Sequence, residues 1–161
     1  MDGIKCVAVD PRDPEARDAL RKYLDEVAVR IFSTTVADEL DDVAEFVAPT
    51  GAFLLMRDRD AAIGCGAVRT LEPGLGEIKR MWIDPDRRGV GLGAEMLAAL
   101  EAASRELGHE HVRPDTNGAL TPAIRMYESR GFRAIERYSD NPDATHFFEK
   151  TLARGSPRRK S

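Results

Sequence analysis

The chain has 161 residues, of which 42% are hydrophobic and 32% charged, and its formal net charge at pH 7 is −4. This length suits one domain with its own core rather than two, and the composition is typical of a soluble globular protein. The acidic balance argues against a general binder of nucleic acid or anionic membranes, and no apolar run approaches the ~20 residues needed to cross a bilayer.

The cysteines and the two ends of the chain bear on location. Cys6 and Cys65 lack the spacing of a metal site or a disulfide framework, which favours a reducing, cytoplasmic setting. Residues 1–10 contain charges and lack the apolar stretch of a signal peptide. Cys65 lies between two glycines in an apolar run and is predicted to be a packed structural thiol. We expect one domain over residues 1–153 and a disordered basic tail over 154–161.

The first third of the chain predicts one strand and two helices. A strand is expected at residues 4–9, and Asp13 with Pro14 then forms a typical helix start. A second helix is expected to run to about Val47, and its acidic outer face is interpreted as solvated. The predicted core stripe of the first helix is Ala16, Leu20, Leu24, Val27 and Ile31.

Three antiparallel strands are predicted next. Residues 52–56 and 61–70 flank a polar turn and read as a hairpin. A turn at 72–76 leads into a third strand, residues 77–83, in which residues of opposite character alternate. Pro85 ends this strand because proline cannot donate to a ladder.

A basic, glycine-rich loop then leads into a helix whose apolar residues recur at the spacing of one buried face. The first N–H groups of a helix have no intrahelical partner, glycines let an anion approach the backbone, and arginines add charge-assisted hydrogen bonds. The loop therefore predicts a phosphate site. Residues 89–94 also fit a loose dinucleotide pattern, G-x-G-x-x-A, although that fingerprint expects its glycines directly after a strand.

The last third predicts a strand at 111–116, a helix from about Ala119 to Arg130, and two closing strands at 132–138 and 145–152. Pro114 removes a ladder donor from the first of these strands, so that strand must border a gap or an edge. This order of elements indicates a mixed α/β sheet.

Two motifs resemble those of the GNAT acyltransferase superfamily. Arg88-Gly89-Val90-Gly91-Leu92-Gly93 is similar to its Arg/Gln-x-x-Gly-x-Gly/Ala signature, and Asn117 followed by Ala123, Tyr127 and Gly131-Phe132 is similar to its second signature. With the strand before the loop, the resemblance covers about residues 52 to 152. It implies a GNAT-like fold, in which a mostly antiparallel mixed sheet of about seven strands is flanked by about four helices and splays between strands 4 and 5.

The resemblance also implies an N-acetyltransferase that moves an acetyl group from acetyl-CoA to a primary amine of a small molecule or peptide, by direct attack in a ternary complex. Backbone N–H groups on the strand before the loop would stabilise charge on the carbonyl oxygen. Tyr127 would protonate the leaving thiolate, and its place between Asn117 and Gly131 favours this role over simple packing in its helix stripe. The residues implied for acetyl-CoA are Met81, Trp82, Ile83, Arg88, Gly89, Val90, Gly91, Leu92, Gly93, Asn117 and Tyr127.

Glu77 is the first candidate for the general base, because some members of the superfamily carry a base glutamate on this strand. Strict alternation would place it on one face with Lys79 and Met81. The alternatives are a surface ion pair, an orienting role, or a water chain with no dedicated base. The weaker candidates for the base are His109, His111 and His146.

Tyr138 and Asn141, in the closing hairpin, are candidate contacts of the acceptor, and no metal site is expected. The identity of the acceptor amine stays open. No nucleic-acid or membrane partner is expected, and the sequence leaves room for a homodimer. Two other functions remain: a sensor that binds acyl-CoA without turnover, and a dinucleotide-dependent oxidoreductase built on the G-x-G-x-x-A match.

Overall fold

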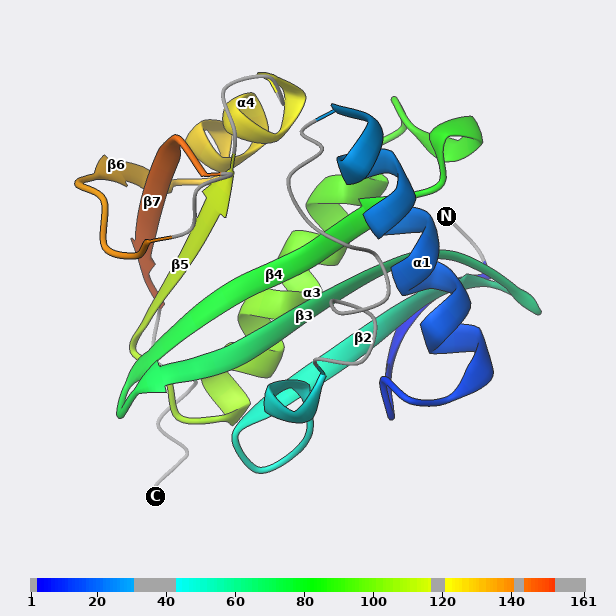
Figure 1. Cartoon of the computed structure of the whole chain (residues 1–161), viewed down its shortest axis with the longest axis horizontal. Helices are drawn as coiled ribbons and strands as arrows, with labels where there is room; N and C mark the ends of the chain where they lie inside the picture. The colour runs from blue at the N-terminus through cyan, green and yellow to red at the C-terminus, as the bar shows by residue number, and fades with distance from the viewer. Residues whose placement is uncertain (1–2, 31–42, 117–120, 141–143, 153–161) are drawn as a thin grey trace.

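The computed structural model describes residues 3–30, 43–116, 121–140 and 144–152. Its helices and strands follow the predicted order, with two short 3-10 helices added (Figure 1). The elements are β1 (Ile4–Val9), α1 (Pro14–Arg30), η1 (Ala44–Phe46), β2 (Gly51–Asp58), β3 (Ala61–Glu72), β4 (Leu75–Ile83), η2 (Pro85–Arg87), α3 (Leu92–Glu106), β5 (His111–Thr116), α4 (Thr121–Ser129), β6 (Arg133–Ile135) and β7 (His146–Thr151).

The seven strands form a sheet in the order β1-β2-β3-β4-β5-β7-β6. Neighbouring strands pair antiparallel except β4 and β5, which are parallel. The predicted mixed, mostly antiparallel sheet is therefore confirmed. The described residues contain three α-helices rather than the four predicted, since most of the predicted second helix falls on residues 31–42, outside the described ranges.

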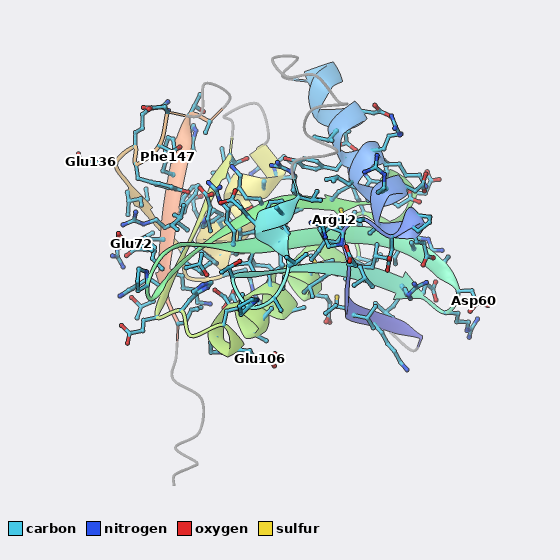
Figure 2. All side chains as sticks on the ribbon, turned by 60° about the horizontal axis from the view of Figure 1, so that its bottom comes forward. Arg12, Asp60, Glu72, Glu106, Glu136 and Phe147 are labelled. Atoms are coloured by element: carbon cyan, nitrogen blue, oxygen red, sulfur yellow. The ribbon has the colours of Figure 1, made fainter. Side chains whose placement is uncertain are left out.

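Two apolar cores lie on opposite faces of the sheet, one under α1 and one under α3 (Figure 1). On the α1 side, Leu20 and Leu24 pack with Phe53 and Trp82. On the other side, α3 buries its predicted stripe against β2, β3 and β4. Exposed charged side chains such as Asp60, Glu72, Glu106 and Glu136 lie at the outer limits of the molecule (Figure 2). No helix in the described part of the chain is long and apolar enough to cross a membrane.

Strands β4 and β5 separate partway along their length. Their pairing runs from Leu75 with His111 to Ile78 with Pro114 and ends there. From this point the two ribbons diverge (Figure 1), and Lys79–Ile83 have no ladder partner on the β5 side within the described residues. Pro114 sits at the last pair, so its missing donor borders the gap, as the sequence predicts. Among the described residues, β4 and β5 thus pair only over the first part of β4.

A β-bulge interrupts β4 where the strands separate. Lys79 is paired with Ala67 and Trp82 with Cys65, so Arg80 and Met81 together oppose a single residue of β3. Arg80 has φ 61°, the left-handed conformation. The prediction that Glu77, Lys79 and Met81 share one face is therefore wrong. Met81 packs against the core under α3, while Arg80 lies over Phe46 of η1 on the opposite face.

Two local predictions have different outcomes. Cys65 is fully buried, its thiol donates to the Arg80 carbonyl oxygen at 3.4 Å, and burial raises its pKa to about 12, so the packed thiol is confirmed. The strand predicted at 132–138 is wrong beyond Ile135. There the Arg137 guanidinium donates to the carbonyl oxygens of Ser139 and Ala144 and holds the chain in a loop.

His109 is a buried structural histidine. The Thr70 hydroxyl donates to the Thr50 carbonyl oxygen at 2.8 Å, so it can accept a hydrogen bond from His109 Nε2, which lies 2.8 Å away. Nδ1 of the same ring then accepts from the Ser104 hydroxyl. The surroundings thus favour a neutral imidazole protonated at Nε2, and burial lowers the pKa of His109.

We expect stability to fall as the pH drops below about 6.5, where the imidazole of the unfolded chain binds a proton that the folded chain resists. Thermal melts of wild type and His109→Gln from pH 7.5 to 5.5 measure this, and the variant should have the shallower slope. His146→Gln, at an exposed histidine, is the control and should keep the wild-type slope. Equal slopes for wild type and His109→Gln would contradict the expectation. Glu149 does not interfere, because its pKa is lowered and it titrates in a more acidic range.

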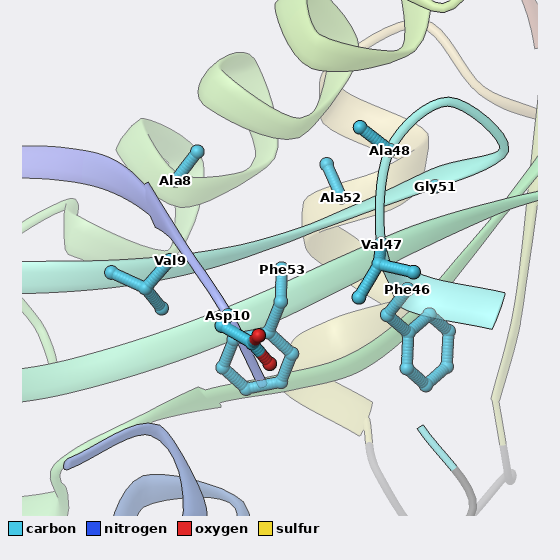
Figure 3. A pocket seen from close by; sticks show the side chains of 9 residues that line it. All are labelled: Ala8, Val9, Asp10, Phe46, Val47, Ala48, Gly51, Ala52 and Phe53. Atoms are coloured by element: carbon cyan, nitrogen blue, oxygen red, sulfur yellow. The ribbon is translucent and has the colours of Figure 1, made fainter. Parts of the chain in front are cut away.

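A shallow apolar pocket of about 310 Å³ lies between the end of β1, the start of β2 and η1 (Figure 3). Phe46 and Phe53 form part of its wall, and Asp10 lies at its margin. None of the residues predicted to contact acetyl-CoA or the acceptor lines it. The pocket is therefore separate from the site described next.

Candidate active site

The glycine-rich loop forms an uncapped start to helix α3. Gly91 is the N-cap residue with φ 87°, and it provides no side-chain cap to this helix end. Gly89 has the same φ of 87°, and Val90 between them is 61% exposed. Leu92 is buried and anchors the first turn in the core. A helix start without a side-chain cap suits the anion site that the sequence predicts at this loop.

Arg88 lies beside this helix start but already has protein partners. Its Nε donates to the Ile83 carbonyl oxygen at 2.8 Å, and its Nη2 donates to Glu26 Oε1 of α1 at 2.7 Å. The same Glu26 oxygen accepts from Trp82 Nε1 at 3.3 Å. An anionic ligand would therefore compete with Glu26 for the Arg88 guanidinium. The side chains of Trp82 and Ile83 are buried in the two cores, which leaves their backbone for ligand contact.

Tyr127 and Met81 meet where β4 leaves β5. Tyr127 lies on α4, is 5% exposed, and packs against Phe132 and Phe148 at ring-centroid distances of 5.5 and 5.7 Å. Its hydroxyl donates to Met81 Sδ at 3.7 Å, across from the bulge of β4. The packing predicted for this tyrosine is thus present, and its hydroxyl points toward the strand that would stabilise the reacting carbonyl. At the start of α3, a Cβ added to Gly93 would lie 3.2 Å from Met126 of α4.

Glu77 is a buried carboxylate with both oxygens engaged. Its side chain is 1% exposed; Oε1 accepts from Arg69 Nε at 2.7 Å and Oε2 accepts from the Tyr138 hydroxyl at 2.6 Å. Arg69 also forms an ion pair with Glu45 of η1. Burial lowers the pKa of Arg69, but the charge of Glu77 and the hydrogen bonds to Glu77 and Glu45 outweigh it and raise that pKa. Glu77 is therefore not a surface charge.

Tyr138 is fixed by an aromatic and ionic frame. The Arg113 guanidinium lies 5.0 Å from its ring centroid, and Phe147 packs edge-on at 5.2 Å. Arg113 Nε in turn donates to Glu149 at 2.8 Å, and Arg133 reaches the other oxygen of Glu149 at 2.7 Å. Burial raises the pKa of Glu149, but Arg113, Arg133 and His111 outweigh it and hold that pKa below its ordinary value.

The structure brings together Glu77 of β4 and Tyr138 of the loop after β6, while two predicted site residues, Asn117 and Asn141, lie outside the described residues. Sequence reasoning missed Arg69 and Arg113. Both are register partners of Glu77, across the β3–β4 hairpin and the β4–β5 pair. Counting back from the turn at 73–74 would have placed Thr70 opposite Glu77, because a register shift between Thr70 and Glu72 is not visible in the sequence.

The three histidines have partners elsewhere. His109 is held by Ser104 and Thr70, and His111 Nδ1 lies 3.1 Å from Thr151 Oγ1. His146 Nδ1 lies 2.8 Å from Thr145 Oγ1 at an exposed position. These are the contacts of the three residues that the sequence offered as weaker candidates for the base.

Comparisons with known proteins agree on the family. A family model described as the acetyltransferase (GNAT) family matches residues 17–132. An uncharacterized N-acetyltransferase of Schizosaccharomyces pombe is 35% identical over 126 residues, which cover 76% of this chain and 77% of that protein. A Klebsiella pneumoniae structure, described as a candidate acyl-CoA N-acyltransferase, matches with a TM-score of 0.73 and 32% identity over 93% of this chain and 98% of its own.

A GNAT family acetyltransferase from Elizabethkingia anophelis, solved with acetyl-CoA bound, has a TM-score of 0.69 at 16% identity and covers 94% of this chain and 100% of its own. The dinucleotide alternative loses its support, because η2 separates β4 from the glycines and β4 belongs to an antiparallel meander. The family match, the mixed sheet splayed between β4 and β5 and the uncapped glycine loop lead to one conclusion: the chain belongs to the GNAT family of acetyltransferases and is an acyltransferase.

Proposed function

We propose that the protein transfers an acetyl group from acetyl-CoA to a primary amine of a small molecule or peptide, by direct attack in a ternary complex. The observation that carries this proposal is the glycine-rich start of α3, which has no side-chain cap, together with the separation of β4 from β5 beyond Ile78. The Elizabethkingia protein of the same fold binds acetyl-CoA, which supports the choice of this acyl donor.

The residues present suit acetyl-CoA. Gly89 and Gly91 let the backbone approach a pyrophosphate, and a Cβ added to Gly89 would meet no protein atom within 4 Å, so the space outside the loop is open. The first N–H groups of α3 would hold the phosphates and Arg88 would add charge. Beyond Ile78 the described residues of β4 and β5 no longer pair, so an extended ligand arm would run between these two strands.

Acetyl-CoA supplies an activated thioester, and the chain's own groups would meet the remaining demands of the reaction. Backbone N–H groups at the bulge of β4, in Met81 to Ile83, would stabilise negative charge on the carbonyl oxygen, a contribution of about 3 kcal/mol when preorganised. The Tyr127 hydroxyl would give its proton to the departing sulfur. Glu77 remains the candidate that ultimately receives a proton from the amine.

Release of free thiol from acetyl-CoA tests the proposal. Wild-type protein is incubated with a panel of glycine, spermidine, kanamycin and a lysine peptide, with a no-acceptor control, and acetyl-CoA binding is measured separately by calorimetry. Thiol release that depends on one amine class supports the transferase and identifies the acceptor class. Tight binding of acetyl-CoA without turnover of any amine would favour a sensor instead. Absence of acetyl-CoA binding would contradict the assignment of the loop.

A further inference from the structure

We propose that Glu26 of α1 is an internal competitor for the phosphate site of this protein. Its carboxylate engages the Arg88 guanidinium, so that acetyl-CoA and the product CoA bind less tightly than the glycine-rich loop would otherwise allow. This inference rests on the proposed function, because it concerns the acyl donor and its product. It assigns a role in binding to a helix residue that lies outside both GNAT motifs.

The position of Glu26 beside the loop is the first reason. Helix α1 crosses the end of β4, from which the chain continues through η2 into the glycine-rich loop (Figure 1). Glu26 Oε1 accepts from Arg88 Nη2 at 2.7 Å, within the range of charge-assisted hydrogen bonds. Arg88 directly precedes Gly89 in the chain. A carboxylate thus holds one of the donors that the pyrophosphate would use.

The anchoring of Arg88 is the second reason. Its Nε donates to the Ile83 carbonyl oxygen at 2.8 Å, and a ligand at the far end of the guanidinium would not need to break this bond. Glu26 binds at that far end, through Nη2. The side chains of Arg88 and Glu26 are 37% and 24% exposed, so the pair is open to solvent and to a ligand arriving from it. One anion can therefore replace the other while Arg88 stays attached to the end of β4.

The displaced carboxylate would keep a partner, which is the third reason. Glu26 Oε1 also accepts from Trp82 Nε1 at 3.3 Å, and the buried Trp82 ring holds this donor in the core under α1. Its partial exposure adds water as a second source of hydrogen bonds. Release from Arg88 therefore does not leave Glu26 as a buried, unpaired charge, whose cost would oppose the exchange. The competition is weak enough for a doubly charged ligand to overcome.

The carboxylate would act equally on the substrate and on the product of the reaction. Acetyl-CoA and CoA carry the same pyrophosphate, so a group that opposes the binding of one opposes the binding of the other. Product release limits the turnover of many enzymes, and a weaker hold on CoA favours that step. Glu26 would thus lower the affinity for the acyl donor and, by the same contact, help CoA to leave.

Calorimetry with acetyl-CoA and with CoA tests the inference on wild type, Glu26→Gln and Glu26→Ala. Both variants remove the charge; glutamine keeps the size of the side chain, and alanine is the best helix former, so either variant decides if the other folds poorly. We expect both to bind acetyl-CoA and CoA about three- to fivefold more tightly, the scale of a partly exposed ion pair. Glu15→Gln is the control, because it removes the same charge from α1 about 16 Å away along the helix axis, and it should keep the wild-type affinity.

Three other results would overturn the inference. Unchanged or weaker binding by both Glu26 variants would mean that Glu26 holds Arg88 in position for the ligand. Tighter binding by a folded Glu26→Gln but not by a folded Glu26→Ala would mean that the new amide donates to the phosphate. An equal gain in Glu15→Gln would assign the effect to net charge rather than to the contact with Arg88. All three leave the proposed function intact, because wild type still binds acetyl-CoA; if wild type binds none, the proposed function fails and this inference with it.

Discussion

Replacing Tyr127 with phenylalanine is expected to lower kcat by about 100-fold, the scale of a lost general acid, with little change in the affinity for acetyl-CoA. The ring packs between Phe132 and Phe148, and phenylalanine keeps those contacts. The hydroxyl is the only part removed, and the hydrogen bond to Met81 Sδ at 3.7 Å that it gives up is long and weak. The loss should therefore fall on chemistry rather than on folding.

Steady-state rates with the identified amine, calorimetry with acetyl-CoA and thermal melts measure these effects together. Tyr23→Phe is the matched control, because it removes the hydroxyl of the tyrosine on α1, which has no predicted role in catalysis, and should retain the wild-type kcat. A Tyr127→Phe variant with wild-type kcat would show that packing alone explains this residue. If Tyr127→Phe melted at a much lower temperature, the loss of activity would be attributed to a disturbed fold and not to the missing proton donor.

Most of the fold followed from local sequence features. The period of the apolar residues located α1, α3 and α4, and Pro85 and the glycines marked the end of β4 and the start of α3. Pro114 was informative because a strand proline has few tolerated positions, and the structure places it at the last pair before the splay. Such features act within a few residues of themselves, which is why sequence alone could find them.

The details of the site depended on contacts between distant parts of the chain. The bulge at Arg80 is one extra residue in a ladder, and alternation by itself gives no sign of it. The hydrogen bond between Tyr138 and Glu77 joins residues 61 positions apart, and it depends on how the closing loop packs on β4. Arg88 has Glu26 as a partner from a helix that carries no family motif. Each of these facts follows from tertiary packing rather than from local pattern.

The ion pair between Arg88 and Glu26 has a consequence for binding. Side-chain exposures of 37% and 24% leave this pair in contact with water, so its own contribution to stability is small. A pyrophosphate with more charge could displace the Glu26 carboxylate from the guanidinium. Most of the selectivity for phosphate should then come from the backbone of the loop, whose shape depends on its glycines.

Replacing Gly91 with alanine is accordingly expected to weaken acetyl-CoA binding by about 100-fold, or about 2.7 kcal/mol. Gly91 has φ 87° at the N-cap of α3, a conformation that costs alanine about 1 to 2 kcal/mol. Alanine would shift the backbone toward negative φ. The first N–H groups of the helix would then no longer point together at one phosphate group.

Gly108→Ala separates the two causes. Gly108 follows the other end of the same helix with φ 93°, and a Cβ added there meets no atom within 4 Å, so this variant experiences similar backbone strain in open space. Both variants should lose a comparable amount of thermal stability, while only Gly91→Ala should bind acetyl-CoA poorly in calorimetry. Equal affinities for the two variants would mean that the helix start does not hold the phosphates. Weak binding by both would mean that strain anywhere in α3 disturbs the site. A site formed by the N-terminus of α3 should respond only to the change at that end of the helix.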